Sequence, residues 1–159
     1  MSDTSNVSVT DWSSGKKVHA GDQFLGLYQP SPETVGFWEG IKRRELLFKW
    51  CGECARAYHP RRMICPRCSS TTLTWKPAAG KGKVYSYSEV HRAPSSEFQK
   101  GAPYNVGLIE TAEGVHFFCR ICVESGARVE VDAPARLDFR VLESGCLLPV
   151  FVVGTEAAK

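Results

Sequence analysis

The sequence lacks any long apolar run. No window reaches eighteen consecutive apolar residues, and residues 1–30 open on polar residues, without the apolar core of a secretory signal peptide. We therefore expect no membrane span and a cytoplasmic, reducing location, in which cysteines do not form disulfides. Repeats and low-complexity tracts are also absent, so the 159 residues make one ordinary domain or two small ones.

Motifs of self-sufficient enzymes are equally scarce. None of the four histidines lies in a His-Glu-x-x-His motif, and the sequence has no Gly-x-Ser-x-Gly elbow. The stretch Gly80-Lys-Gly-Lys83 does not match the phosphate-loop pattern of nucleotide hydrolases, and its glycines fit a sharp entry into a strand. The chain therefore offers no recognisable nucleophile and base, and we do not expect it to catalyse a reaction alone.

The strongest chemical signal is a pair of Cys-x-x-Cys motifs. Cys51-Gly-Glu-Cys54 and Cys65-Pro-Arg-Cys68 are separated by ten residues, a spacing that brings four thiolates onto one tetrahedral Zn²⁺. The alternatives are two disulfides or four free thiols, but the odd total of seven cysteines fits four ligands and three bystanders better. A closed four-sulfur shell leaves no position for water or substrate, so this zinc is expected to be structural.

Each cysteine pair is followed by a residue other than the usual glycine. Ala55 and Ser69 stand where the chain of such a turn passes through positive φ, and we expect mild strain or a different turn there.

The remaining cysteines carry no metal signal. Cys119-Arg-Ile-Cys122 repeats the spacing, but it falls on a predicted strand, where residues three apart point to opposite faces. Cys146 lies beside Gly145 and is expected to act as a small apolar residue.

The pattern along the chain predicts a mainly β protein in three parts. Residues 1–30 form an arm with scattered aromatics, which we expect to dock onto a partner. Residues 31–77 hold a short helix over about 32–43, capped at Ser31, followed by a small three-stranded zinc ribbon. Residues 78–159 contain five strands without a helix between them, which indicates a small barrel, and the loop over 93–103 is its longest interruption.

The basic residues are concentrated in one part of the chain. Residues 41–100 hold 13 Lys and Arg but 4 Asp and Glu, whereas the flanks are acidic. If the fold gathers these cations, their surface would attract the phosphate of a nucleic acid or of a small cofactor. The alternative is a solvated face that carries no function.

The ordered motifs resemble one known family. They are Phe37-Trp-Glu-Gly40, the two cysteine pairs with Pro60-Arg61 between them, Gly80-Lys-Gly-Lys-Val-Tyr-Ser-Tyr87, His91-Arg-Ala-Pro94 and Ala102-Pro-Tyr104. This series is similar to the proteins with a rubredoxin-like zinc ribbon and an OB-fold that accompany thiolases and related acyl-CoA enzymes. The resemblance covers residues 31–153 and leaves residues 1–30 outside.

The resemblance implies a non-catalytic subunit of a hetero-oligomer. Its partner would be a thiolase-fold enzyme of acyl-CoA degradation or acyl transfer, and a coenzyme A thioester would be their shared ligand. By position, Cys51, Cys54, Cys65 and Cys68 correspond to the family's zinc ligands. Phosphate-facing candidates in the basic segment are Lys81, Lys83, Arg92 and Lys100, and aromatic candidates for a partner interface are Trp12, Phe37 and Trp38.

The alternative function is nucleic-acid binding, since zinc ribbons and OB-folds both serve it. Tyr85, Tyr87 and Phe118 could then stack on bases. The 8 acidic against 5 basic residues in 101–159 argue against a continuous nucleic-acid track over the barrel.

Overall fold

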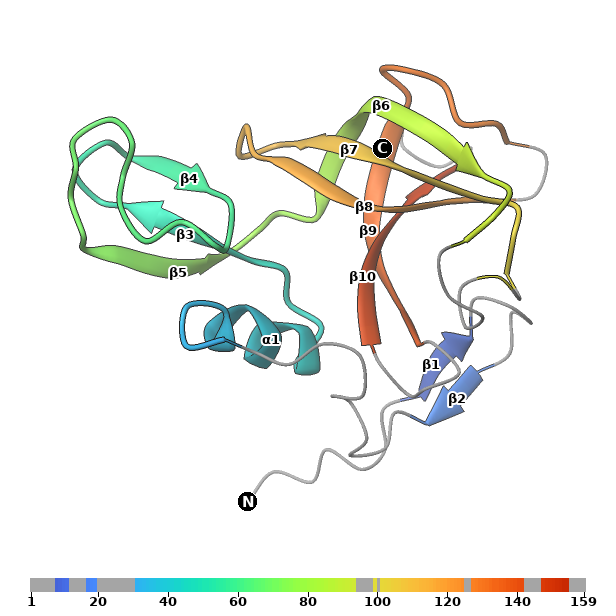
Figure 1. Cartoon of the computed structure of the whole chain (residues 1–159), viewed down its shortest axis with the longest axis horizontal. Helices are drawn as coiled ribbons and strands as arrows, with labels where there is room; N and C mark the ends of the chain where they lie inside the picture. Colours follow the sequence, from blue (N-terminus) through green and yellow to red (C-terminus); the bar gives the residue numbers. More distant parts are fainter. Residues whose placement is uncertain are drawn as a thin grey trace.

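A computed structural model describes residues 8–11, 17–19, 31–93, 99, 101–124, 127–141 and 147–154. It is mainly β, as the sequence predicts, with one short helix among the described residues. A small three-stranded sheet lies at one side of a larger barrel, and the helix runs beneath the small sheet (Figure 1). No helix in the described part is long and apolar enough to cross a membrane.

The helix α1 (Val35–Lys42) begins later than the sequence predicts. Ser31 does not cap it: the Thr34 N–H donates to the Ser31 carbonyl at 2.9 Å, and the Ser31 N–H donates to Thr34 Oγ1 at 3.0 Å. These bonds close a separate turn over Ser31 to Thr34, and Thr34 becomes the residue before the first helical turn. The predicted Ser31 cap is therefore wrong, because its hydrogen-bonding groups are used within the turn.

The helix packs closely on the small sheet through two glycines. A Cβ added to Gly36 would meet the Trp75 indole, and one added to Gly40 would meet the Leu47 side chain at 2.6 Å. Backbone therefore lies directly against side chains at both places.

The small sheet is the ribbon, with strand order β4-β3-β5. All pairs are antiparallel, and the strands are β3 (Leu47–Cys51), β4 (Arg56–Tyr58) and β5 (Leu73–Pro77). Lysines cover its two tryptophans: the Lys49 ammonium lies 3.8 Å from the Trp75 ring centre, and that of Lys76 lies 4.2 Å from the Trp50 ring centre.

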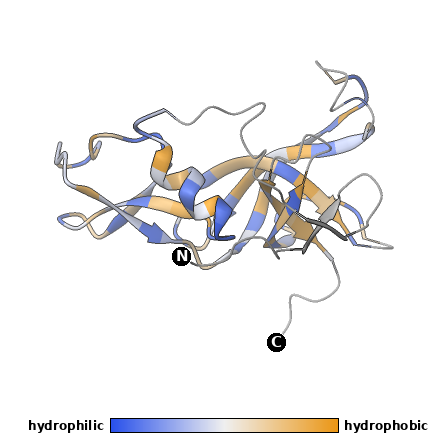
Figure 2. Ribbon diagram, turned by 90° about the horizontal axis from the view of Figure 1, so that it is seen from below, coloured by the Kyte–Doolittle hydropathy of each residue, from blue (hydrophilic) through white to orange (hydrophobic). Residues whose placement is uncertain are grey.

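The barrel contains the five strands that the sequence predicts. They are β6 (Lys81–Val90), β7 (Tyr104–Thr111), β8 (His116–Val123), β9 (Pro134–Val141) and β10 (Leu147–Val153). Their order is β10-β8-β7-β6-β9, and β9 pairs again with β10, which closes the barrel. Most pairs are antiparallel, whereas β10 runs parallel to β8. Apolar segments concentrate on these strands (Figure 2).

The described part of the N-terminal arm extends this sheet. The strand β1 (Ser8–Asp11) runs parallel to the end of β9, with Thr10 opposite Arg140, and β2 (Lys17–His19) pairs with β1. The arm thus contacts the barrel of its own chain.

Ribbon, helix and barrel share one core. Phe37, Ile41, Leu46 and Phe48 belong to the same buried cluster as barrel residues such as Phe117. A chain of this length buries a sizeable core more easily as one unit than as two.

Candidate metal centre

Four cysteine sulfurs converge in the ribbon. The sulfurs of Cys51, Cys54, Cys65 and Cys68 all lie within 4.8 Å of one another. Cys51 and Cys68 are 3.6 Å apart at their sulfurs, and Cys54 and Cys65 are 3.8 Å apart. Ligands at about 2.3 Å from a tetrahedral Zn²⁺ are roughly 3.8 Å from each other. The four residues are therefore positioned to bind a metal, and the six described cysteines form no disulfide.

The turns that carry these cysteines have the predicted backbone. Ala55 has φ 50° and Ser69 has φ 58°, so both non-glycine residues are held in the left-handed region. In the second turn the Ser69 N–H donates to the Cys65 carbonyl at 2.9 Å, and the Cys65 N–H donates to the Ser70 carbonyl at 2.8 Å. The two positions predicted to be strained are the two that the cysteine turns force through positive φ.

Tyr58 is a further member of the site, which the sequence analysis missed. Its hydroxyl lies 3.4 Å from the Cys65 sulfur. Burial raises the pKa of Cys65, but the hydrogen bond with the Tyr58 hydroxyl and those from the Cys68 and Arg67 N–H groups outweigh it and lower that pKa to about 6. The same contact raises the pKa of Tyr58 to about 12, so the tyrosine stays protonated and can donate to a thiolate. The sequence offered one sign of this role: Tyr58 lies on the strand that directly follows the first cysteine pair.

The geometry of the cysteine centre suits a structural metal ion. Cys51 and Cys65 are fully buried, and with four protein ligands a tetrahedral ion keeps no open position. Cys119 and Cys122 are not part of this centre. Among the described residues, the four ribbon cysteines form the one group of side chains that could hold a metal ion.

The phosphate-facing candidates do not form one cluster. Lys81 begins β6, whereas Arg92 lies beyond the other end of that 10-residue strand, which extends roughly 30 Å. Lys83 is already bound to Asp132 at 3.0 Å and to Glu110 at 3.3 Å. Arg92 therefore lies apart from Lys81 and Lys83, and Lys100 lies outside the described residues, so the phosphate-facing role of these four residues stays a prediction.

The interface candidates also differ from one another. Phe37 is 9% exposed and contacts Phe117, so most of its side chain is covered by the core of its own chain. Trp38 is half-buried and lies edge-on to Phe37. Trp12 lies outside the described residues.

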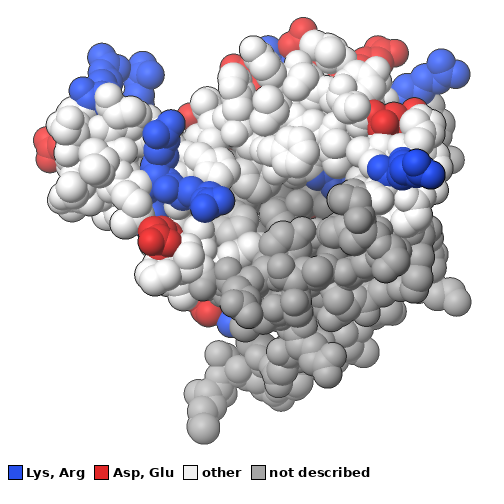
Figure 3. All heavy atoms as spheres, viewed as in Figure 1, with Lys and Arg blue, Asp and Glu red and all other residues white. Residues whose placement is uncertain are grey.

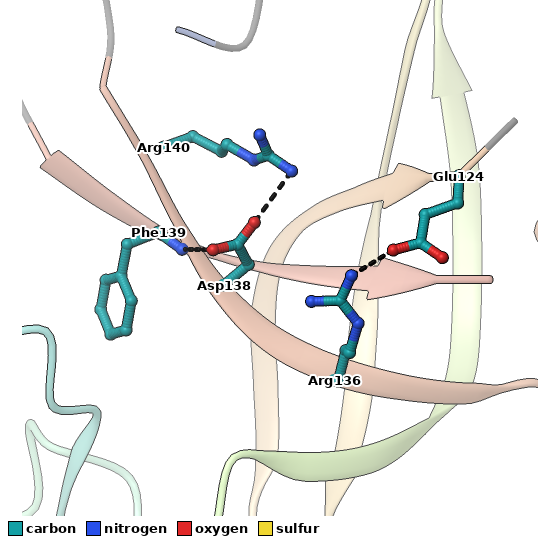
Figure 4. Close-up of polar contacts among 5 residues, drawn as sticks. All are labelled: Glu124, Arg136, Asp138, Phe139 and Arg140. Carbon is teal, nitrogen blue, oxygen red and sulfur yellow. Dashed lines mark hydrogen bonds and ion pairs between the residues drawn. The ribbon is translucent and has the colours of Figure 1, made fainter. Parts of the chain in front are cut away.

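Charge is distributed unevenly between the two parts. Lys and Arg gather on the ribbon and along its side nearest the barrel (Figure 3). On the barrel, two arginines of β9 are paired with acids: Arg136 binds Glu124, and Arg140 binds Asp138 at 2.8 Å (Figure 4). Nine of the 13 basic residues of 41–100 lie between residues 42 and 76, on the helix and the ribbon.

Comparisons with known proteins agree with this architecture. The model for the rubredoxin-like zinc ribbon domain of ChsH2 matches residues 38–74, and that for the C-terminal OB-fold domain of ChsH2 matches residues 75–140. A DUF35 domain-containing scaffold protein of Methanothermobacter thermautotrophicus is 34% identical over 71% of this chain and 86% of its own length. The chain belongs to the DUF35 family.

Other relatives match different shares of the chain. The scaffold protein of Methanocaldococcus jannaschii is 46% identical over 51% of this chain and 58% of its own length. The 3-oxo-4,17-pregnadiene-20-carboxyl-CoA hydratase alpha subunit of Mycobacterium tuberculosis is 28% identical over 69% of this chain, and the match spans 34% of that subunit. A chain of the Ltp2-ChsH2(DUF35) aldolase has a TM-score of 0.69 and 31% identity, and covers 79% of this chain and 98% of its own.

Proposed function

We propose that this DUF35 protein is a non-catalytic scaffold subunit that holds a thiolase-type enzyme in a complex acting on acyl-CoA. The observation that carries the proposal is the likeness to the DUF35 chain of an aldolase complex along 98% of that chain. The name of the hydratase relative supports an acyl-CoA as the substrate class. The closed cysteine centre supports the absence of chemistry at the metal, because four protein ligands leave no position for a reacting group.

The test is capture of the tagged, zinc-loaded chain from its native cells, followed by purification of the two proteins together. We expect a thiolase-fold protein at fixed stoichiometry and turnover of an acyl-CoA by the complex. The chain alone should show no turnover. Capture without any condensing or cleaving acyl-CoA enzyme, or full turnover by the isolated chain, would contradict the proposal.

Nucleic-acid binding is the second candidate, and exposed aromatic side chains on the barrel favour it. Tyr85 is 51% exposed, Tyr87 44% and Phe118 63%, so all three are accessible to bases. Oligonucleotide binding at two salt concentrations separates the candidates. Affinity that falls steeply with salt and is lost on replacing Tyr85 or Phe118 by alanine would favour this second function.

A further inference from the structure

A cleft separates the ribbon from one end of the barrel. Its volume is about 540 Å³, within the range of small-molecule sites. The ribbon side is lined by Arg56, His59 and Arg62. The barrel side is lined by Glu113, within the turn between β7 and β8, and by His116, the first residue of β8. None of these residues ligates the metal.

The two guanidinium groups of the cleft are not paired with an acidic side chain of the described residues. Among the described residues, neither Arg56 nor Arg62 forms an ion pair, whereas Lys83, Arg136 and Arg140 all do. A guanidinium presents a rigid fork of N–H donors that matches two oxygens of one phosphate. Two such groups on one wall can hold an anion between them.

The two imidazoles of the cleft are held in place by stacking. The His59 ring stacks on Phe117 with centres 6.2 Å apart, and the His116 ring stacks on Tyr85 with centres 4.4 Å apart. His59 Nδ1 accepts the Arg61 N–H at 3.3 Å, so the proton of the neutral ring lies on Nε2. Burial, followed by Arg61 and Arg62, lowers the pKa of His59, which favours this neutral donor.

The acid in the cleft wall is engaged with the backbone. Glu113 Oε1 accepts the Ala79 N–H at 2.6 Å, and its Oε2 is buried. The cleft lining therefore holds two arginines and one carboxylate, which gives it a net positive charge.

We propose that this cleft binds a phosphate-bearing small molecule, with Arg56 and Arg62 on the phosphate oxygens and His59 Nε2 as an additional donor. The volume exceeds that of phosphate alone, so the rest of a nucleotide-sized ligand fits beside it. The site does not depend on the scaffold function, because every group in it belongs to this chain. The phosphate can be free or part of a cofactor, and the probes below distinguish these sources.

The experiment is calorimetric titration of the zinc-loaded full chain with inorganic pyrophosphate, adenosine 3′,5′-bisphosphate, coenzyme A and phosphate-free pantetheine. We expect the phosphate-bearing probes to bind and pantetheine not to bind. Arg56→Gln and Arg62→Gln should each weaken binding by about 10-fold or more, the range for a hydrogen bond to a charged group. Arg67→Gln and Arg128→Gln are the matched controls, since both remove exposed cations outside the cleft, and they should leave affinity unchanged.

Preference among the probes identifies the source. Equal affinity for pyrophosphate and the larger probes would assign a free phosphate, and tighter binding of the bisphosphate or coenzyme A would assign a cofactor. No binding of any phosphate probe, or equal losses in the cleft and control variants, would overturn the proposal. A third outcome would also overturn it: the small probes do not bind, but a single-stranded oligonucleotide does, with an affinity that falls steeply with salt and is weakened in the cleft variants. Capture of the partner enzyme by the Arg56→Gln variant is measured separately. A variant that loses phosphate binding but still captures the partner separates the cleft from the scaffold function.

Discussion

The Phe48 ring of the ribbon and the Phe117 ring of the barrel lie with their centres 6.0 Å apart and their planes at 57°. Phe117 also contacts Phe37 of the helix at 6.3 Å and stacks with His59. One barrel side chain thus meets the helix and two elements of the ribbon. The metal-bearing unit and the barrel are thereby joined by packing as well as by the linker after Pro77.

Replacing Phe117 by alanine should destabilise the whole chain by about 3–5 kcal/mol, because it removes a 5%-exposed ring and leaves a cavity at the junction. Urea denaturation followed by tryptophan fluorescence measures this. The matched control is Phe118→Ala, which removes the neighbouring ring from an exposed position and should change stability by about 0.5 kcal/mol or less. Similar losses in the two variants would contradict the shared core.

The sequence was sufficient for the features that depend on local chemistry. Cysteine spacing predicted the metal centre, and missing glycines predicted the positive φ at Ala55 and Ser69. Features that depend on packing between distant parts of the chain could not be predicted from the sequence. Helical spacing marked Phe37 as apolar but could not say whether the barrel or a partner covers it, and Phe117 lies 80 positions away in the sequence. The cleft was missed for the same reason, since the ribbon and the turn between β7 and β8 each provide one wall.

Removing the metal should destabilise the barrel as well as the ribbon. The metal holds the four sulfurs together, and its binding free energy stabilises the folded ribbon. Without a cation, hydrogen bonding by Cys68, together with burial, raises the pKa of Cys54 to about 12, so this thiol stays protonated and no longer acts as a ligand. Because Phe48 and Ile41 pack in the common core, loss of ribbon order exposes part of the barrel. Hydrogen exchange should become faster in β3–β5 and, to a lesser degree, in β8 after chelation. Unchanged exchange in β3–β5 would show that the metal does not stabilise the ribbon.

Tyr58→Phe should weaken zinc binding by about 10–100-fold, the range for loss of an outer hydrogen bond to a metal ligand. The variant keeps the ring and removes the hydroxyl that lies 3.4 Å from the Cys65 sulfur. Competition with a chromogenic chelator measures the affinity. Tyr87→Phe removes an exposed hydroxyl from the barrel and should leave the affinity unchanged.

Glycine at the two strained turn positions should stabilise the protein. Ala55→Gly and Ser69→Gly each relieve a left-handed backbone that costs a non-glycine residue about 1–2 kcal/mol, partly offset by the entropy of glycine in the unfolded chain. We expect a net gain of about 0.5–1 kcal/mol per site in urea denaturation of the zinc-loaded protein. The control Ala57→Gly, within β4, should instead lower stability. A loss at both turn positions would indicate that their side chains provide contacts worth more than the strain.

Acid should destabilise the wild type more than a variant without the His59 imidazole. Burial, with Arg61 and Arg62, lowers the pKa of His59 from its ordinary 6.5, so the folded chain resists protonation of this ring. As pH falls through 6.5, the unfolded chain binds a proton that the folded chain resists, and stability is lost until the pH is below the folded pKa. The free energy of unfolding should therefore fall more between pH 7.5 and 5.5 for the wild type than for His59→Gln. Zinc release at low pH affects both proteins, so the informative quantity is the difference between them, and a constant difference across this range would show that His59 titrates alike in both states.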